Sequence, residues 1–137
     1  MQLELHDNVQ FIYELVLAQM ELEALAGECR VSPNLREFTV PDSSDAELLV
    51  RRCAYFRSVD GRLTDYHHLQ QYNRTRSVNQ YLTHWFYPYK GKFHPQMVRA
   101  LLTILGLEPG QWVLDPFVGS GTTAVEAQLL GVNCIGV

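Results

Sequence analysis

Residues 113–123, with the sequence VLDPFVGSGTT, constrain the fold of this chain more strongly than any other segment. The apolar residues at its start are typical of a short buried strand, and the segment from Thr122 onward has the composition of a helix. Gly119 and Gly121 lie between them, where glycine allows a sharp turn and a close approach of the backbone to a ligand. This order of strand, glycine-rich loop and helix predicts an α/β fold with a ligand at the start of the helix.

The same loop indicates the chemistry of its ligand. The free N–H groups at a helix N-terminus favour an anion, and Asp115 at the carboxyl end of the strand offers an acceptor to a cation. A ligand that carries both a carboxylate and an ammonium group suits this pair. The methionine part of S-adenosylmethionine is such a ligand.

Other interpretations of the glycines exist. Gly119, Gly121 and Ala124 also match the dinucleotide-binding pattern G-x-G-x-x-A, which describes only the turn and the close packing of the helix. A strand, turn and helix with a purely structural role is a further alternative. A phosphate loop of the triphosphatase type is excluded, because it requires Gly-Lys-Ser/Thr and no lysine follows Gly121.

The run DPFVGSGTT resembles the cofactor-binding motif of the S-adenosylmethionine-dependent amino-methyltransferases, the N-4/N-6 DNA methylase family, to which the tRNA guanine-N2 methyltransferases are related. Upstream, FHPQ at residues 93–96 resembles the Phe-His-Pro element that closes over the methionine end of the cofactor in that family. The GSGTT form is closer to the DNA branch than to the tRNA enzymes. The cofactor-binding residues that this resemblance implies are Phe93, His94, Pro95, Asp115, Pro116, Phe117, Gly119, Ser120, Gly121, Thr122 and Thr123.

The resemblance also implies a reaction, the transfer of a methyl group to an exocyclic amino nitrogen of a base. Adenine N6 or cytosine N4 of DNA is favoured, and tRNA guanine N2 is the alternative. Family members activate the amino group with an Asp/Asn/Ser-Pro-Pro-aromatic turn, but this sequence contains no two adjacent prolines, so no catalytic residue is assigned. We therefore expect an N-terminal fragment or split subunit of a longer enzyme, inactive without its C-terminal half. A non-catalytic nucleic-acid-binding module is the alternative.

Charge is strongly segregated along the chain. Residues 1–50 carry two arginines and ten acidic residues, whereas residues 51–99 carry nine basic and two acidic residues. This basic segment also holds ten of the 15 aromatic residues, and arginines with aromatic rings are suited to phosphates and unpaired bases. The alternative is that the rings are core residues and the arginines a solvated rim. The arginines that we expect to contact nucleic acid are Arg51, Arg52, Arg57, Arg62, Arg74 and Arg76.

We expect three parts: a small α+β module over residues 1–59, a basic, aromatic-rich connector without regular structure over residues 60–92, and a truncated methyltransferase domain over residues 93–137. The last part would be the first βαβ step of a doubly wound, Rossmann-like sheet. Its expected elements are a helix from Pro95, capped by His94 and packed through Met97, Ala100, Leu101 and Ile104, a strand at 111–114, a helix at 122–130 and a strand at 132–137.

In the N-terminal module, the β-prone residues 10–17 are compatible with a strand, followed by a helix over 18–26 that Gly27 would end. Ser44 and Glu47 match a capping box before a helix at 46–54. Short strands are expected at 36–40 and 55–59.

Cysteine and histidine spacing argues against a metal site or disulfides. The three cysteines form no Cys-x-x-Cys pair, His67 and His68 are adjacent, and neither His84 nor His94 brings a carboxylate or cysteine at ligand spacing. The N-terminus lacks a basic region followed by an apolar run, and no segment is apolar enough to span a membrane. We therefore expect a cytoplasmic protein without a membrane partner.

Overall fold

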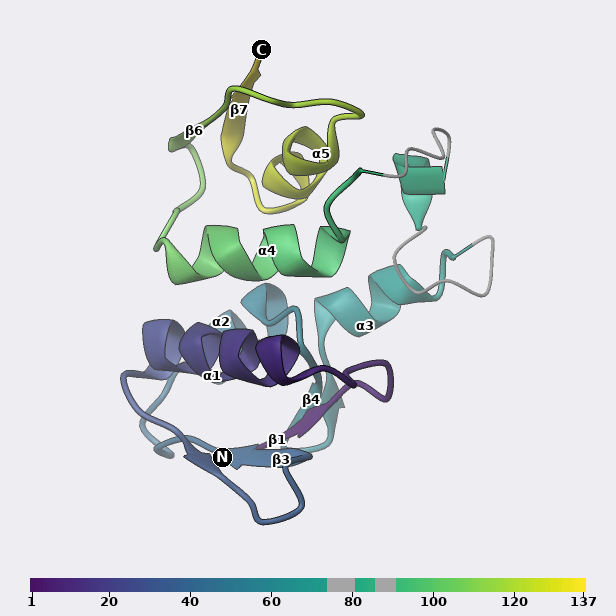
Figure 1. Ribbon diagram of the computed structural model, residues 1–137. Coiled ribbons are helices and arrows are strands. Elements are labelled where there is room, and N and C mark those ends of the chain that lie inside the picture. The colour runs from purple at the N-terminus through teal and green to yellow at the C-terminus, as the bar shows by residue number, and fades with distance from the viewer. Residues whose placement is uncertain (74–80, 86–90) are drawn as a thin grey trace.

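The computed structural model describes residues 1–73, 81–85 and 91–137 (Figure 1). An antiparallel sheet and its helices form the N-terminal part, and a parallel strand pair with one helix forms the C-terminal part. Helix α4 (Pro95–Ile104) lies between the two parts, with α1 (Ile12–Ala26) on one side and α5 (Thr122–Leu129) on the other. The structure is therefore mixed α/β, as the sequence predicts.

The N-terminal sheet is built around the first strand, β1 (Gln2–Leu5), which is absent from the expected elements. It pairs antiparallel with β3 (Glu37–Thr39) and β4 (Phe56–Val59), and the short strands β2 (Arg30–Val31) and β5 (Arg62–Leu63) complete the order β2-β3-β1-β4-β5. Since β5 pairs with β4, the sheet crosses the boundary that we expected at residue 59.

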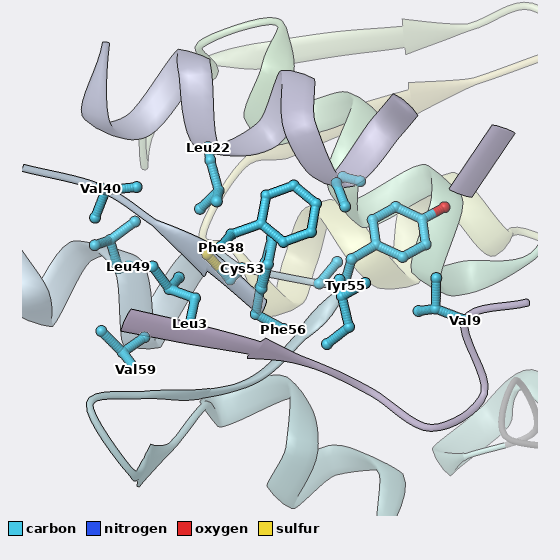
Figure 2. Close-up of a cluster of buried hydrophobic side chains, with 14 of the residues drawn as sticks. Leu3, Val9, Leu22, Phe38, Val40, Leu49, Cys53, Tyr55, Phe56 and Val59 are labelled. Atoms are coloured by element: carbon cyan, nitrogen blue, oxygen red, sulfur yellow. The ribbon is translucent and has the colours of Figure 1, made fainter. Parts of the chain in front are cut away.

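One face of this sheet and helix α1 enclose the main core. The alternation of β1 directs Leu3 and Leu5 inward, and the ring of Phe38 stands edge-on to that of Phe56, 5.1 Å away between ring centres. Figure 2 shows Leu3, Phe38 and Phe56 gathered with Leu22 of the helix and with Leu49, Cys53 and Tyr55.

Helix α1 begins at Ile12, so the expected strand over residues 10–17 is wrong. The Glu14 carboxylate accepts hydrogen bonds from the backbone N–H groups of Gln10 and Phe11, at 2.8 and 3.0 Å, and thereby satisfies donors that a helix start leaves open. This cap and the packing of Ala18 and Leu22 outweigh the β-propensity of the preceding residues. The helix ends at Gly27, as predicted, with φ at 81°.

Helix α2 (Ala46–Arg52) forms where the sequence predicts it but is capped differently. Asp45 is the N-cap, and its carboxylate accepts from the N–H of Leu48, so the expected capping box of Ser44 and Glu47 is wrong. The helix also stops two residues earlier than expected, because Cys53 already has an extended backbone.

The connector expected over residues 60–92 contains regular structure in its described parts, which corrects that expectation. Besides β5, it holds helix α3 (Asp65–Gln70) and a 3₁₀ turn at Leu82–Trp85. The Thr64 hydroxyl accepts from the N–H of His67 at the start of α3 and donates to the carbonyl of Phe56, which ties this helix to the sheet.

The C-terminal part follows the predicted order of elements. Strands β6 (Trp112–Asp115) and β7 (Asn133–Gly136) pair in parallel, and α5 connects them. Helix α5 packs on α4 and on β7 around a cluster of Val98, Leu102, Ala127, Leu130 and Val132, and Val113 and Cys134 of the two strands pack against this cluster. On the strands, Trp112, Leu114 and Ile135 remain exposed.

Helix α4 is buried on two sides, which corrects its expected apolar face. Leu101 is 39% exposed, whereas the polar side chains of Gln96, Arg99 and Thr103 are buried. These polar groups bind the backbone of the N-terminal part: Gln96 Nε2 donates to the carbonyl of Ala54 at 3.0 Å, and Arg99 Nη2 to that of Arg51 at 3.1 Å. The helix therefore joins the two parts through hydrogen bonds from buried side chains to the backbone.

Candidate functional site

A small hollow of about 50 Å³ lies at the carboxyl end of β6. The loop after this strand, the first turn of α5 and the segment before α4 form its walls. The lining residues are Gly91, Lys92, Phe93, Asp115, Phe117, Val118, Gly119, Ser120, Thr122 and Thr123. The structure therefore brings together two motifs that the sequence separates by about 20 residues.

Most of the residues expected at a cofactor site line this hollow. Phe93, Asp115, Phe117, Gly119, Ser120, Thr122 and Thr123 do so, whereas His94, Pro95, Pro116 and Gly121 adjoin lining residues in the chain. His94 is the N-cap of α4 and Pro95 its first residue, as predicted. Sequence reasoning missed Gly91, Lys92 and Val118, whose only signal is their position next to motif residues.

The loop owes its shape to its glycines and to Asp115. Gly119 and Gly121 have φ values of 50° and 84°, in the left-handed region that favours glycine. One oxygen of the Asp115 carboxylate accepts from the N–H of Phe117 at 3.0 Å, and the N–H of Gly121 donates to the carbonyl of Val118 at 2.8 Å. The carbonyl of Asp115 also accepts from the N–H of Val137, which fixes the loop to the end of β7.

The donors and acceptors of the hollow suit the amino-acid end of a ligand. The N-cap of helix α5 is Gly121, which offers no side-chain cap to the N–H groups of the first turn, and Thr122 and Thr123 of this turn line the hollow. Asp115 supplies a carboxylate to the lining of the same hollow. A Cβ added at Gly121 would meet no heavy atom within 4 Å, which leaves the backbone open to approach. The volume fits an end group rather than a whole nucleoside.

Lys92 adds a positive charge to the wall of the hollow. Its ammonium group donates to the carbonyl of His84, and partial burial lowers the pKa of this lysine. The lysine therefore ties the wall to the 3₁₀ turn at Leu82–Trp85.

The six arginines expected at nucleic acid have different environments. Arg52 is buried and donates to the carbonyl of Leu107 at 2.6 Å, and Arg62 forms a two-pronged ion pair with Glu47. Arg51 is exposed and Arg57 half-buried. Arg74 and Arg76 lie outside the described residues. None of the four described arginines lines the hollow at the cofactor motif.

Over the described ranges, no three His, Cys, Asp or Glu side chains are grouped as a metal ion would require. No helix there is long and apolar enough to cross a membrane. Cys29, Cys53 and Cys134 are free thiols, and burial raises the pKa of Cys53 well above its usual value.

Comparison with known proteins identifies methyltransferases as relatives. The type II methyltransferase M.BsoBI of Geobacillus stearothermophilus is 39% identical over 67 residues, which are 49% of this chain and 12% of that protein. M.MjaII of Methanocaldococcus jannaschii is 42% identical over 69 residues, 50% of this chain and 12% of its own length. A tRNA (guanine(10)-N2)-dimethyltransferase of Methanothermobacter thermautotrophicus is 38% identical over 52 residues, 38% of this chain and 15% of that enzyme.

The chain thus spans less than a fifth of the length of each of these relatives. No solved structure matches it significantly. A family model described as DNA methylase, for N6 and N4 methyltransferases, matches residues 31–137 and includes both motifs that line the hollow. Because this match covers most of the sequence, the chain belongs to the N-4/N-6 DNA methylase family.

Proposed function

We propose that this chain forms the S-adenosylmethionine-binding part of an enzyme that methylates an exocyclic amino group of a DNA base. The observation that carries the proposal is the hollow where Phe93 meets the loop from Asp115 to Thr123. The first turn of α5 would hold the cofactor carboxylate, Asp115 its ammonium group, and Phe93 would cover this end. When bound, the cofactor supplies a methyl group on a positively charged sulfur.

We further propose that β6, α5 and β7 are the first βαβ step of a doubly wound sheet. The parallel pairing of the two strands supports this, and so does the exposed apolar face formed by Trp112, Leu114 and Ile135, which a second layer of helices would cover.

Adenine N6 or cytosine N4 of DNA is the favoured acceptor, because the family model and the type II methyltransferases among the relatives point to DNA. The second candidate is guanine N2 of tRNA, which the similarity to the tRNA dimethyltransferase favours.

In either case, Arg51 and Arg57 are the described arginines best placed for phosphate contacts, and Arg74 and Arg76 remain proposed contacts.

Equilibrium binding of methyl-labelled S-adenosylmethionine tests the proposal, with S-adenosylhomocysteine and NAD as competitors. We expect S-adenosylhomocysteine to displace the label and NAD to leave it bound. Equal displacement by NAD would favour the dinucleotide interpretation of the loop. Parallel titrations with duplex DNA and with tRNA then compare the two acceptor classes, since the DNA proposal expects tighter binding of DNA.

A further inference from the structure

Helix α5 carries a fully buried carboxylate one turn after the residues that line the hollow. Glu126 has no exposed surface and lies four positions after Thr122, on the same side of the helix. Burial of a carboxylate is costly unless other groups pair with it, so its partners indicate what the site is built to hold.

Those partners come from the segment before α4 and from α4 itself. The Tyr81 hydroxyl donates to Glu126 Oε1, and His84 Nε2 lies 2.9 Å from the same oxygen. Arg99 Nη1 of α4 lies 3.6 Å from the other oxygen, Oε2. Around these contacts, the rings of Tyr81 and His84 meet edge to face at 5.0 Å, and Tyr66 lies against both Tyr81 and the Arg99 guanidinium.

The same histidine is connected to the hollow. The carbonyl of His84 accepts from the Lys92 ammonium group, and Lys92 and Phe93 form the wall opposite the glycine loop. The Glu126 carboxylate therefore contacts the His84 side chain, and the His84 carbonyl holds Lys92 in this wall. Both sides of the hollow are fixed to one helix, since α5 carries Thr122 and Thr123 as well as Glu126.

We propose that Glu126 and His84 are positioning residues for the cofactor site: their buried contact keeps the Lys92–Phe93 wall closed against the first turn of α5. This inference rests on the function proposed above. Glu126 and His84 do not line the hollow, and their effect on the cofactor would act through Lys92 and Phe93, which do. A network with a purely structural role would stabilise the fold without setting cofactor affinity.

The test compares two substitutions of His84 in the full chain. His84→Leu keeps much of the bulk but removes the hydrogen bond to Glu126, whereas His84→Gln can place its amide nitrogen near the position of Nε2 and donate. Calorimetry with S-adenosylhomocysteine should show binding about tenfold weaker for His84→Leu, the effect of one hydrogen bond to a charged group, and near-normal binding for His84→Gln.

Val59→Ala is the matched control, because it weakens the N-terminal core away from the hollow. We expect it to lower the unfolding temperature but to leave affinity unchanged.

If His84→Leu does not fold, His84→Asn replaces it, since its shorter side chain cannot reach Glu126. Normal affinity in a folded variant without this hydrogen bond would overturn the positioning role and leave the proposed function intact. Failure of the wild-type chain to bind would instead overturn the proposed function.

Discussion

At the scale of single residues, Gly136 shows how closely the loop after β6 packs against the end of β7. A Cβ at this position would lie 2.7 Å from Val118 Cγ2 and 2.8 Å from Val118 Cβ, closer than side chains approach. Val118 lines the hollow, so a side chain at residue 136 has to displace the loop.

We predict that Gly136→Ala weakens S-adenosylhomocysteine binding and lowers the free energy of unfolding by about 1–3 kcal/mol, the usual cost of overpacking. Calorimetry and urea denaturation measure the two effects. Adding Val118→Ala removes the two methyl groups in the clash and should restore part of the affinity and part of the stability. Unchanged affinity for S-adenosylhomocysteine in Gly136→Ala would show that the position of Val118 does not affect ligand binding in the hollow.

The sequence predicts site residues where a backbone requirement leaves a mark. Gly119 and Gly121 do adopt positive φ values, and Asp115 and Phe93 do meet at one hollow. The contacts of Glu126 could not be predicted in this way, because Tyr81, His84 and Arg99 share no spacing with it. Only the packing of the segment at residues 81–84 with α4 and α5 brings these polar side chains into one buried cluster.

At the scale of elements, helix α1 is attached to the turn between α2 and β4 by a buried carboxylate. Glu21 Oε1 accepts from the N–H of Ala54 at 2.8 Å, and Oε2 from that of Tyr55 at 3.2 Å. Burial raises the pKa of Glu21 to about 7 from its usual 4.5, although the two N–H donors act in the opposite direction. The folded protein therefore favours the protonated carboxyl.

The contribution of Glu21 to stability is greatest below pH 4.5 and is lost as the pH rises through about 7. We predict that Glu21→Gln, which cannot ionise, gains stability relative to the wild type over this range, on the order of 3 kcal/mol. Urea denaturation of both proteins at several pH values measures the difference. A difference that does not change with pH would mean that Glu21 is ionised in the folded protein throughout.

The contribution of His6 to stability should depend on pH in the opposite direction to that of Glu21. Burial lowers the pKa of this histidine from 6.5 to about 3, with smaller contributions from the charges of His67 and Arg57. Its contribution to stability is present above pH 6.5 and is lost as the pH falls toward 3, since the unfolded chain takes up the proton first. We predict that His6→Leu gains stability relative to the wild type as the pH falls through this range. The same denaturation series checks this, and a constant difference would contradict it.

The elements themselves were predictable to different extents. Helix α5 and strands β6 and β7 occur close to their expected bounds, because turn residues such as Pro109, Gly110 and Gly131 delimit them. The start of α1 was not predictable from β-prone residues, since it depends on the Glu14 cap. Helix α3 has only six residues and is stabilised by the burial of Tyr66, so its sequence shows no helical pattern of apolar residues from which it could be predicted.

At the scale of the whole molecule, charge segregation predicts where nucleic acid binds. We predict that Arg51→Gln combined with Arg57→Gln weakens binding of duplex DNA regardless of sequence. The slope of log affinity against log salt should fall by about 0.9 for each phosphate that is no longer neutralised. Fluorescence anisotropy at several salt concentrations measures this slope. Arg30→Gln is the matched control, because Arg30 is exposed on β2 in the acidic half of the chain; an equal effect of this control would contradict a localised surface.

The central claim for the molecule is that the hollow binds the amino-acid end of S-adenosylmethionine, and Asp115 is the residue that tests it. Asp115→Asn retains an oxygen that accepts from the N–H of Phe117, so the loop keeps its shape. The other group of the amide, its NH₂, is a donor and cannot accept a hydrogen bond from the ammonium group of the cofactor.

The most direct measurement is calorimetric titration of the wild type and Asp115→Asn with S-adenosylhomocysteine, with NAD as the comparison ligand. We predict that the wild type binds S-adenosylhomocysteine and that the substitution costs about 1.5–3 kcal/mol of binding free energy, or roughly ten- to a hundredfold in affinity. NAD should bind weakly to both proteins. Tight binding of NAD that is indifferent to Asp115, or equal binding of S-adenosylhomocysteine by the two proteins, would contradict this prediction.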